Sequence, residues 1–368
     1  MSNPLNEVYK LGQSIWLDNI SRGLIESGEL RRLIVEDAVK GVTSNPTIFE
    51  KAISSGSDYD ASIQNILQKN PQVSVADLYE KLIIKDIQEG ADNLRDVYEE
   101  TNGVDGYISV EVSPELAADT QGTIEEAKSL WQKIDKPNLM IKVPATKEGI
   151  PAVRHLISEG INVNVTLMFS MEHYQAVAEA YIAGLEDRVA KGGAVDNIAS
   201  VASFFVSRVD SAVDKLLAGK KESGLQGKIA VANSKVVYAD GSRIFSLPRF
   251  RKLADNGAKP QRLLWASTGT KNPAYSDVLY LDELIGADTV NTVPPATLNA
   301  FRDHGTPAVT LTNNVDAAQG SLNQLAELGI SLTEVAEKLQ VDGVQSFIDS
   351  FRSLMAVIAK KRDLLLNR

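Results

Sequence analysis

The sequence Asn-Val-Asn-Val-Thr-Leu-Met, residues 162–168, alternates polar and apolar side chains over its first six positions. Successive side chains of a β-strand point to opposite faces, so Asn162, Asn164 and Thr166 share one face and the apolar residues share the other. In a barrel, alternate residues of each strand point into the lumen and the others face the surrounding helices. The stretch therefore predicts a barrel strand with polar residues inside.

The same unit recurs along the chain: a short apolar run, a polar or Gly/Pro break, then a helical pattern. In residues 172–189, apolar side chains recur at helical spacing from Tyr174 to Leu185 and form one stripe. Strands that alternate with helices are parallel. Eight strands with inward polar residues near their C-terminal ends favour a closed (β/α)₈ TIM barrel with extra helices over an open sheet. The seven further predicted strands are residues 14–18, 41–45, 107–112, 139–143, 198–206, 262–267 and 289–293.

We expect residues 1–368 to form a single barrel domain. A minimal barrel takes about 250 residues, so the rest of the chain lies outside the repeating unit. We place it in helical insertions at about 50–101 and 210–260 and in a C-terminal helical tail at about 298–368, with one insertion helix at 75–101. In the tail, Ser331-Leu-Thr-Glu334 matches the capping box that opens a helix, which we expect to pack on the barrel surface.

The composition excludes several classes of function. Forty-three per cent of the residues are apolar and 23% are charged, values typical of a globular protein. A net charge of −10 argues against a wide basic face for nucleic acid. The chain has no cysteine, and its three histidines lack metal-ligand spacing, so we expect neither disulfides nor a metal site. With no signal-peptide pattern and no long apolar stretch, we expect a cytoplasmic protein without a membrane span.

Lys142 is the first candidate for a nucleophile. It lies in Leu139-Met-Ile-Lys-Val-Pro-Ala-Thr146, within a strand that is otherwise apolar. Burying an ammonium group is costly, and desolvation lowers a lysine pKa by as much as about 3–5 units, which leaves a free amine able to attack a carbonyl. The alternative is a strand-end lysine whose charge reaches solvent along its methylene chain.

Acidic and hydrogen-bonding residues share the inward face with Lys142. A Schiff-base enzyme needs an acid that expels water from the carbinolamine, and a group that moves a hydroxyl proton during carbon–carbon cleavage. Glu111 and Asp18 occupy inward positions late in their strands. Each residue taken singly has an alternative role as a strand-end cap, but one shared lumen favours a polyol site. The hydrogen-bonding members of this set are Thr43, Asn45, Asn164, Thr166 and Ser203.

A candidate phosphate site follows the sixth and seventh predicted strands. Arg208 comes after the sixth strand, and Ser267-Thr-Gly-Thr-Lys271-Asn comes after the seventh. Backbone amides near a glycine bind anions, and barrels often bind phosphate beside strands seven and eight. Arg208, Ser267 and Lys271 are therefore candidate phosphate ligands. The pattern differs from the phosphate-binding loop of NTPases, and no dinucleotide fingerprint follows an early strand.

Four segments, in the expected order, resemble sequence blocks of the transaldolase family. The first two resemble the two signatures of the family, and the second signature contains the Schiff-base lysine. The resemblance spans about residues 10–300, and the tail is consistent with the longer bacterial branch of the family. The four segments are GVTSNPTIF at 41–49, MIKVPATKEGI at 140–150, INVNVTLMFS at 161–170 and SFFVSR at 203–208.

The resemblance implies an enzyme of the non-oxidative pentose phosphate pathway without a metal or organic cofactor. Such an enzyme moves a dihydroxyacetone unit from fructose 6-phosphate or sedoheptulose 7-phosphate to erythrose 4-phosphate or glyceraldehyde 3-phosphate. By motif position, Lys142 would form the Schiff base, and Glu111 would act through a water beside Thr166. Asp18 would take the C4 hydroxyl proton. The other implied contacts are Asn45, Asn164 and Ser203 to the dihydroxyacetone unit, and Arg208, Ser267 and Lys271 to phosphate.

Two departures from the family pattern bear on function. The loop after the seventh strand is two residues longer than in the shorter branch. In this loop Lys271 replaces an arginine, so the phosphate would bind the compact ammonium group of lysine rather than the paired N–H donors of a guanidinium. Phe205 replaces a tyrosine whose hydroxyl helps related fructose 6-phosphate aldolases release dihydroxyacetone, which favours transfer over release. The alternatives are an aldolase that releases the three-carbon unit and a barrel that binds sugar phosphates without turnover. We expect no nucleic acid or membrane partner, and a monomer or homodimer.

Overall fold

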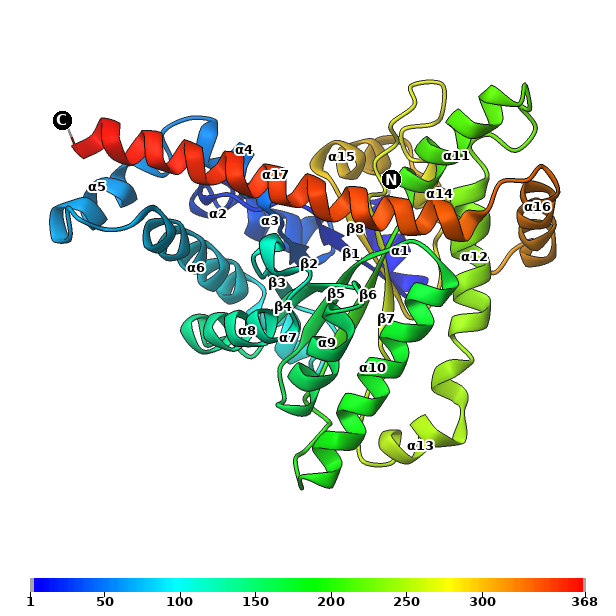
Figure 1. Ribbon diagram of the computed structural model, residues 1–368, viewed down its shortest axis with the longest axis horizontal. Helices are drawn as coiled ribbons and strands as arrows, with labels where there is room; N and C mark the ends of the chain where they lie inside the picture. The colour runs from blue at the N-terminus through cyan, green and yellow to red at the C-terminus, as the bar shows by residue number, and fades with distance from the viewer. Residues whose placement is uncertain (1–2, 367–368) are drawn as a thin grey trace.

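Eight parallel strands form a closed barrel in the computed structural model, which describes residues 3–366 (Figure 1). The strands pair in sequence order, and β1 closes the ring against β8. Each strand begins and ends within two residues of a run predicted from the sequence, so the predicted TIM barrel is confirmed. The strands are β1 Gln13–Leu17, β2 Val39–Thr43, β3 Tyr107–Glu111, β4 Leu139–Pro144, β5 Val163–Met168, β6 Ser200–Phe205, β7 Arg262–Ala266 and β8 Thr289–Val293.

Helices surround this barrel (Figure 1). The apolar stripe from Tyr174 to Leu185 is buried on α10, as its spacing predicts. The predicted helix at 75–101 is divided into two helices, since the first ends at Asn93 and the second begins at Arg95. The helices before β4 are α1 Pro4–Lys10, α2 Arg22–Glu26, α3 Glu29–Glu36, α4 Pro46–Ser54, α5 Asp60–Lys69, α6 Val75–Asn93, α7 Arg95–Glu100, η1 Pro114–Leu116 and α8 Thr120–Ile134.

Helices also occupy the second insertion and the tail. That these segments and the barrel form one domain stays a prediction. The helices after β4 are α9 Gly149–Ser158, α10 Met171–Ala190, α11 Ser207–Gly219, α12 Ile229–Gly241, η2 Ile244–Ser246, α13 Pro248–Ala254, α14 Leu279–Glu283, α15 Pro295–His304, α16 Val315–Glu327 and α17 Leu332–Leu366.

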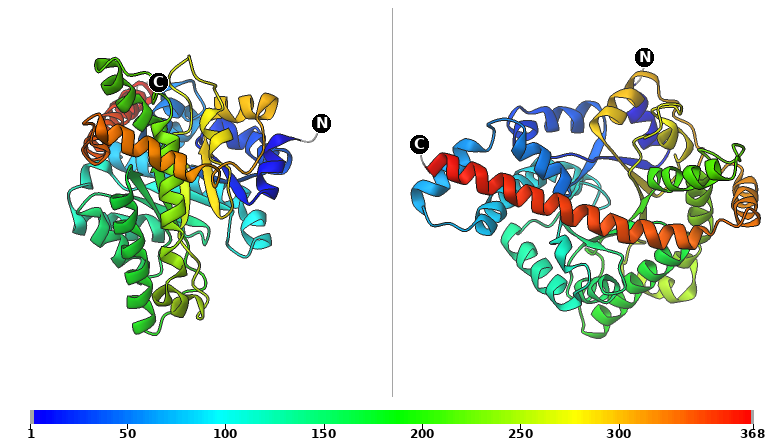
Figure 2. Two further views of the ribbon diagram at one scale, coloured as in Figure 1. Left: turned by 90° about the vertical axis from the view of Figure 1, so that its right-hand side faces the viewer. Right: turned by 45° about the horizontal axis from the view of Figure 1, so that its top comes forward.

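The long helix α17 crosses the C-terminal mouth of the barrel (Figures 1 and 2). Its Gln340 Nε2 donates to the carbonyl oxygens of Ala145 at 2.9 Å and Leu167 at 3.1 Å, at the ends of β4 and β5. The Ser331 hydroxyl accepts from the Glu334 amide at 3.2 Å, so the capping box opens this helix as its sequence indicates. The sequence indicated a helix on the barrel surface, but not its course across the mouth.

Side chains and hydrogen bonds fill the lumen around Trp16. Trp16 is fully buried, and its Nε1 donates to Asp105 Oδ1 at 3.0 Å. Arg262 donates to the same oxygen at 3.1 Å. The indole needs a glycine on the next strand, because a Cβ at Gly41 would lie 2.5 Å from the ring. Barrel enzymes place their chemistry at the opposite, C-terminal mouth of the lumen.

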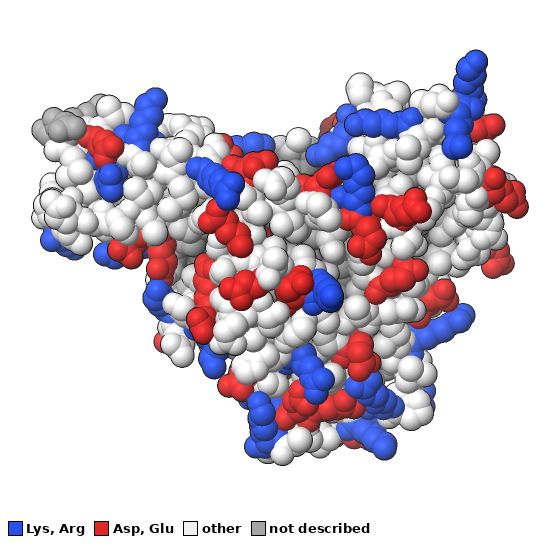
Figure 3. Space-filling model, viewed as in Figure 1, with Lys and Arg blue, Asp and Glu red and all other residues white. Residues whose placement is uncertain are grey.

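The surface carries charges of both signs. On the face shown in Figure 3, Lys and Arg side chains are interspersed with Asp and Glu side chains rather than gathered in one broad patch. That nucleic acid is not a partner stays a prediction from the net charge. Within residues 3–366, no helix has the length and apolar character needed to cross a membrane.

Candidate active site

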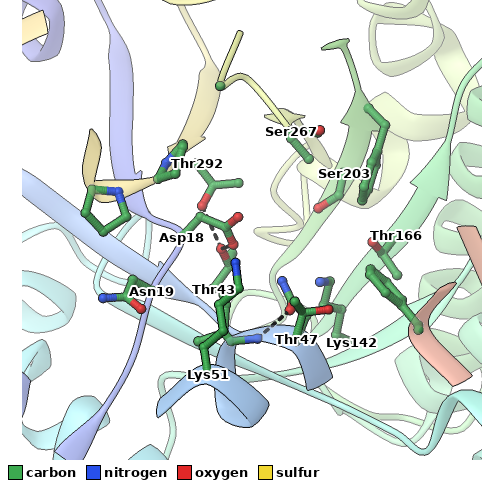
Figure 4. Close-up of a pocket in the computed structure, with 18 of the residues that line it drawn as sticks. Asp18, Asn19, Thr43, Thr47, Lys51, Lys142, Thr166, Ser203, Ser267 and Thr292 are labelled. Carbon is green, nitrogen blue, oxygen red and sulfur yellow. Dashed lines mark hydrogen bonds between the residues drawn. The ribbon is translucent and has the colours of Figure 1, made fainter. Parts of the chain in front are cut away.

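A cavity of about 590 Å³ opens at the C-terminal mouth of the barrel (Figure 4). Ten of the twelve residues that the sequence singled out line this cavity. The other two, Glu111 and Asn164, lie behind the lining and contact lining residues. The ten lining residues are Asp18, Thr43, Asn45, Lys142, Thr166, Ser203, Phe205, Arg208, Ser267 and Lys271.

Lys142 places its amine at the floor of the cavity, beside a carboxylate. Its Nζ lies 3.3 Å from Glu111 Oε2 and donates to the Ser44 carbonyl at 3.2 Å. The pair comes from neighbouring positions of β3 and β4, and both side chains are less than a tenth exposed. Burial raises the pKa of Glu111, and the nearby Lys142 opposes that rise. A buried amine next to a carboxyl with a raised pKa provides a nucleophile and a proton carrier in one place.

Asp18 lies across the cavity from Thr166 and Ser203, as Figure 4 shows. The Thr43 hydroxyl donates to Asp18 Oδ1 at 2.7 Å and lies 2.6 Å from the Thr292 hydroxyl. Because a hydroxyl has a single hydrogen, Thr292 donates to Thr43 and Thr43 donates to Asp18. Burial raises the pKa of Asp18, and Lys142 again opposes the rise. Asp18 is thus a carboxyl held in place by a hydroxyl chain.

Asn164 lies in the lumen but does not face the cavity. Its Nδ2 donates to Ser109 Oγ at 3.0 Å, and its Oδ1 accepts from Ser203 Oγ at 2.6 Å. Asn164 therefore orients Ser203, which does line the cavity. Thr166 Oγ1 is buried and has no hydrogen-bond partner within residues 3–366, so its hydroxyl is free for a group in the cavity.

Asn45 has two roles in the structure. Its Oδ1 accepts from the Ile48 amide at 3.0 Å and caps α4, which is the alternative role considered for it from the sequence. The same side chain lines the cavity. Because this cap holds the asparagine side chain in one orientation, its Nδ2 is well placed to donate to a ligand.

Cationic groups line the cavity on the side of β6 and β7. The guanidinium of Arg208, the second residue of α11, has no ion pair within 4.0 Å and no hydrogen bond to residues 3–366, and its carbon lies 5.1 Å from the centre of the Phe205 ring. Ser267 adopts a left-handed conformation, with φ at +55°, directly after β7, and its hydroxyl lies 3.0 Å from the Ser207 hydroxyl. Lys271 is exposed at the rim. This side of the cavity can hold an anion.

Several other lining residues were not candidates from the sequence, among them Phe347 on α17, Lys51 on α4 and Thr292 on β8. Thr292 lay in a predicted strand beside other polar residues, so its strand position was a usable signal. Phe347 lies more than fifty residues beyond the last strand, where nothing local predicts contact with the lumen. Among the described side chains, 3–366, no group of three or more His, Asp or Glu residues could hold a metal ion.

Comparisons with known proteins all point to one family. Residues 15–358 match the family described as Transaldolase/Fructose-6-phosphate aldolase. The protein named Transaldolase from Trichodesmium erythraeum (strain IMS101) is 48% identical over 374 residues, which cover 98% of each chain. Proteins of the same name from Thermobifida fusca (strain YX) and Thiobacillus denitrificans (strain ATCC 25259 / T1) are each 47% identical. They cover 98% and 97% of this chain, and 99% of their own lengths.

Proposed function

The chain belongs to the transaldolase/fructose-6-phosphate aldolase family, and we propose that it is a transaldolase. It moves a dihydroxyacetone unit from fructose 6-phosphate or sedoheptulose 7-phosphate to erythrose 4-phosphate or glyceraldehyde 3-phosphate. The place of this reaction is the non-oxidative pentose phosphate pathway of the cytoplasm. The observation that carries the proposal is the buried Lys142 amine, 3.3 Å from Glu111, in a cavity that also holds Asp18 and the cationic Arg208.

The first half of the proposed reaction forms and breaks bonds around Lys142. Its amine attacks the C2 ketone of the donor, and the resulting carbinolamine loses water to give an iminium ion. Glu111 supplies the proton that leaves with this water, through a water molecule beside Thr166. Asp18 then takes the C4 hydroxyl proton, the C3–C4 bond breaks, and its electron pair moves into the iminium to give an enamine while the aldose phosphate leaves.

The second half reverses these steps on the acceptor. The enamine carbon attacks the aldehyde carbon of the second aldose phosphate, and Asp18 returns its proton to the new hydroxyl. Water then hydrolyses the iminium, which frees the longer or shorter ketose phosphate and the Lys142 amine. The raised pKa values of Glu111 and Asp18 support this assignment, because a proton carrier works best with a pKa near the working pH.

The remaining residues hold the substrate in this proposal. Arg208, Ser267 and Lys271 bind the phosphate group, and Asn45 and Ser203 bind the dihydroxyacetone hydroxyls. Asn164 supports Ser203 through its hydrogen bond, and its direct contact with substrate stays a prediction. Phe205 has no hydroxyl with which to assist release of the three-carbon unit, which supports transfer over free aldol cleavage.

An acceptor-dependence assay tests the proposed function. The protein is mixed with fructose 6-phosphate with and without erythrose 4-phosphate, and products are separated by chromatography. We expect sedoheptulose 7-phosphate and glyceraldehyde 3-phosphate only when the acceptor is present, and no turnover in Lys142→Ala. Free dihydroxyacetone without an acceptor, at the rate of transfer, would instead identify an aldolase. Substrate binding without turnover would identify a non-catalytic sugar-phosphate barrel.

A further inference from the structure

One face of α17 is built to lie close against the mouth of the barrel. Gln340, Gly343 and Phe347 are three and four residues apart, a spacing that places them on the same side of a helix. Gln340 donates to the Ala145 and Leu167 carbonyls. A Cβ at Gly343 would lie 2.8 Å from Leu167 Cδ2 and 3.3 Å from Arg208 Nη1, so the missing side chain permits this close approach.

The close approach is fixed at both ends of this face. At the β5 end, Leu167 adopts a left-handed conformation with φ at +63°, which is unusual for a bulky residue and interrupts the strand register. Its carbonyl is one of the two acceptors of Gln340. One turn beyond Phe347, Ser350 Oγ accepts from Thr47 Oγ1 of α4 at 2.8 Å. These contacts hold α17 in one position over the cavity.

Phe347 is the side chain that α17 contributes to the cavity, and it is only 5% exposed. The centre of its ring lies 5.6 Å from Lys142 Nζ and 5.8 Å from the guanidinium carbon of Arg208. Arg208 also lies 5.1 Å from the ring centre of Phe205, so two aromatic rings flank it. One ring therefore contacts both the amine of the proposed Schiff base and the cation of the proposed phosphate site.

We infer that Phe347 is a positioning residue that makes α17 part of the active site, an inference that rests on the proposed function. Its ring holds Arg208 toward the phosphate group and covers the dihydroxyacetone intermediate on Lys142. Release of that intermediate requires protonation of the enamine carbon and addition of water to the C=N carbon. The water oxygen becomes the ketone oxygen, and the amine leaves. Addition of water at the C=N carbon also ends the transfer reaction, so protonation of the enamine carbon is the step that belongs to release alone. By covering the enamine and limiting its access to a proton from solvent, Phe347 retains the intermediate until an acceptor aldehyde binds.

Two substitutions separate the effect of Phe347 on Arg208 from its effect as a cover over the intermediate on Lys142. Phe347→Leu keeps most of the apolar cover but removes the aromatic face, so we expect KM for fructose 6-phosphate and the inhibition constant of inorganic phosphate to rise roughly fivefold. Its kcat and its low release of dihydroxyacetone stay close to those of the unmodified protein. Phe347→Ala removes the cover as well, so the ratio of dihydroxyacetone release to transfer also rises.

Leu354→Ala is the matched control. Leu354 lies on the same helix, is fully buried, and is not among the residues that line the cavity. A merely structural role for buried apolar residues of α17 would give this control the same kinetic changes as Phe347→Ala. We expect its KM, phosphate inhibition and release ratio to match those of the unmodified protein.

The measurements are steady-state kinetics with fructose 6-phosphate, with and without erythrose 4-phosphate, in the full chain. Unchanged KM and phosphate inhibition in Phe347→Leu, or an unchanged release ratio in a folded Phe347→Ala, would overturn the inference. If Phe347→Ala does not fold, Phe347→Leu decides alone. Absence of acceptor-dependent transfer in the unmodified protein would instead overturn the proposed function, so the two failures are distinct.

Discussion

Replacing Lys142 with methionine removes the cation beside Glu111 while it keeps most of the side-chain volume. Glu111 is then a buried carboxyl without its ion-pair partner at 3.3 Å, and the cations that remain near it and Asp18 are Arg208 and Lys271. Breaking a buried pair by removal of one partner typically costs about 3–5 kcal/mol, because an uncompensated charge remains in the interior. With Arg208 still nearby, we expect a loss of about 2–3 kcal/mol in the free energy of unfolding at pH 8.

The loss depends on pH with a definite sign. Burial raises the folded-state pKa of Glu111 and Asp18, and Lys142 opposes both rises, so its removal raises both pKa values further. A carboxyl whose pKa is higher in the folded state binds its proton more tightly there, and folding stability falls as pH rises through that pKa. For Glu111, this fall in folding stability begins above the ordinary glutamate pKa of 4.5. The deficit of Lys142→Met is therefore largest at pH 8 and shrinks toward pH 5.

Urea unfolding followed by circular dichroism at pH 5, 6.5 and 8 measures this deficit. The double variant Lys142→Met with Glu111→Gln is the control, because it removes the stranded charge together with its partner. We expect the double variant to recover most of the stability lost at pH 8. A deficit of equal size at all three pH values, or no recovery in the double variant, would refute the electrostatic reasoning.

Three further substitutions test separate parts of the site. Phe205→Tyr adds a hydroxyl in the cavity, so free dihydroxyacetone formed without an acceptor increases; an unchanged amount removes Phe205 as the reason for transfer. Asp18→Asn slows carbon–carbon cleavage by roughly 100-fold or more in single-turnover assays while the Schiff base still forms, and wild-type cleavage contradicts its role. Asn164→Ala loses buried hydrogen bonds to Ser109 and Ser203 and lowers the unfolding free energy by about 2–3 kcal/mol in urea titrations. An unchanged unfolding midpoint would show that this network adds no stability.

The barrel was predictable because each strand carries its own signal. In residues 162–168, polar and apolar residues alternate, and this alternation identifies the side chains that face the lumen. Side chains of one parity in a closed barrel converge on one axis, whatever their separation in the chain. Lys142, Glu111 and Asp18 could therefore be assigned to one lumen from sequence alone.

The parts that escaped prediction depend on contacts between distant segments. The position of α17 depends on Gln340 reaching the Ala145 and Leu167 carbonyls and on space at Gly343, which no local pattern encodes. Phe347 follows from that position. The orientation of Asn164 was also out of reach, because a lumen residue has several possible partners and hydrogen bonding to Ser203 turns it away from the cavity.

Borohydride trapping followed by peptide mass spectrometry tests whether Lys142 forms the Schiff base. The protein is incubated with fructose 6-phosphate, reduced, digested and sequenced by tandem mass spectrometry. Hydride reduction of the iminium carbon fixes the substrate carbon to the lysine nitrogen as a stable secondary amine. We predict a reduced dihydroxyacetone adduct on Lys142 alone. An adduct on Lys147 or Lys271, or no adduct under conditions of active turnover, would contradict it.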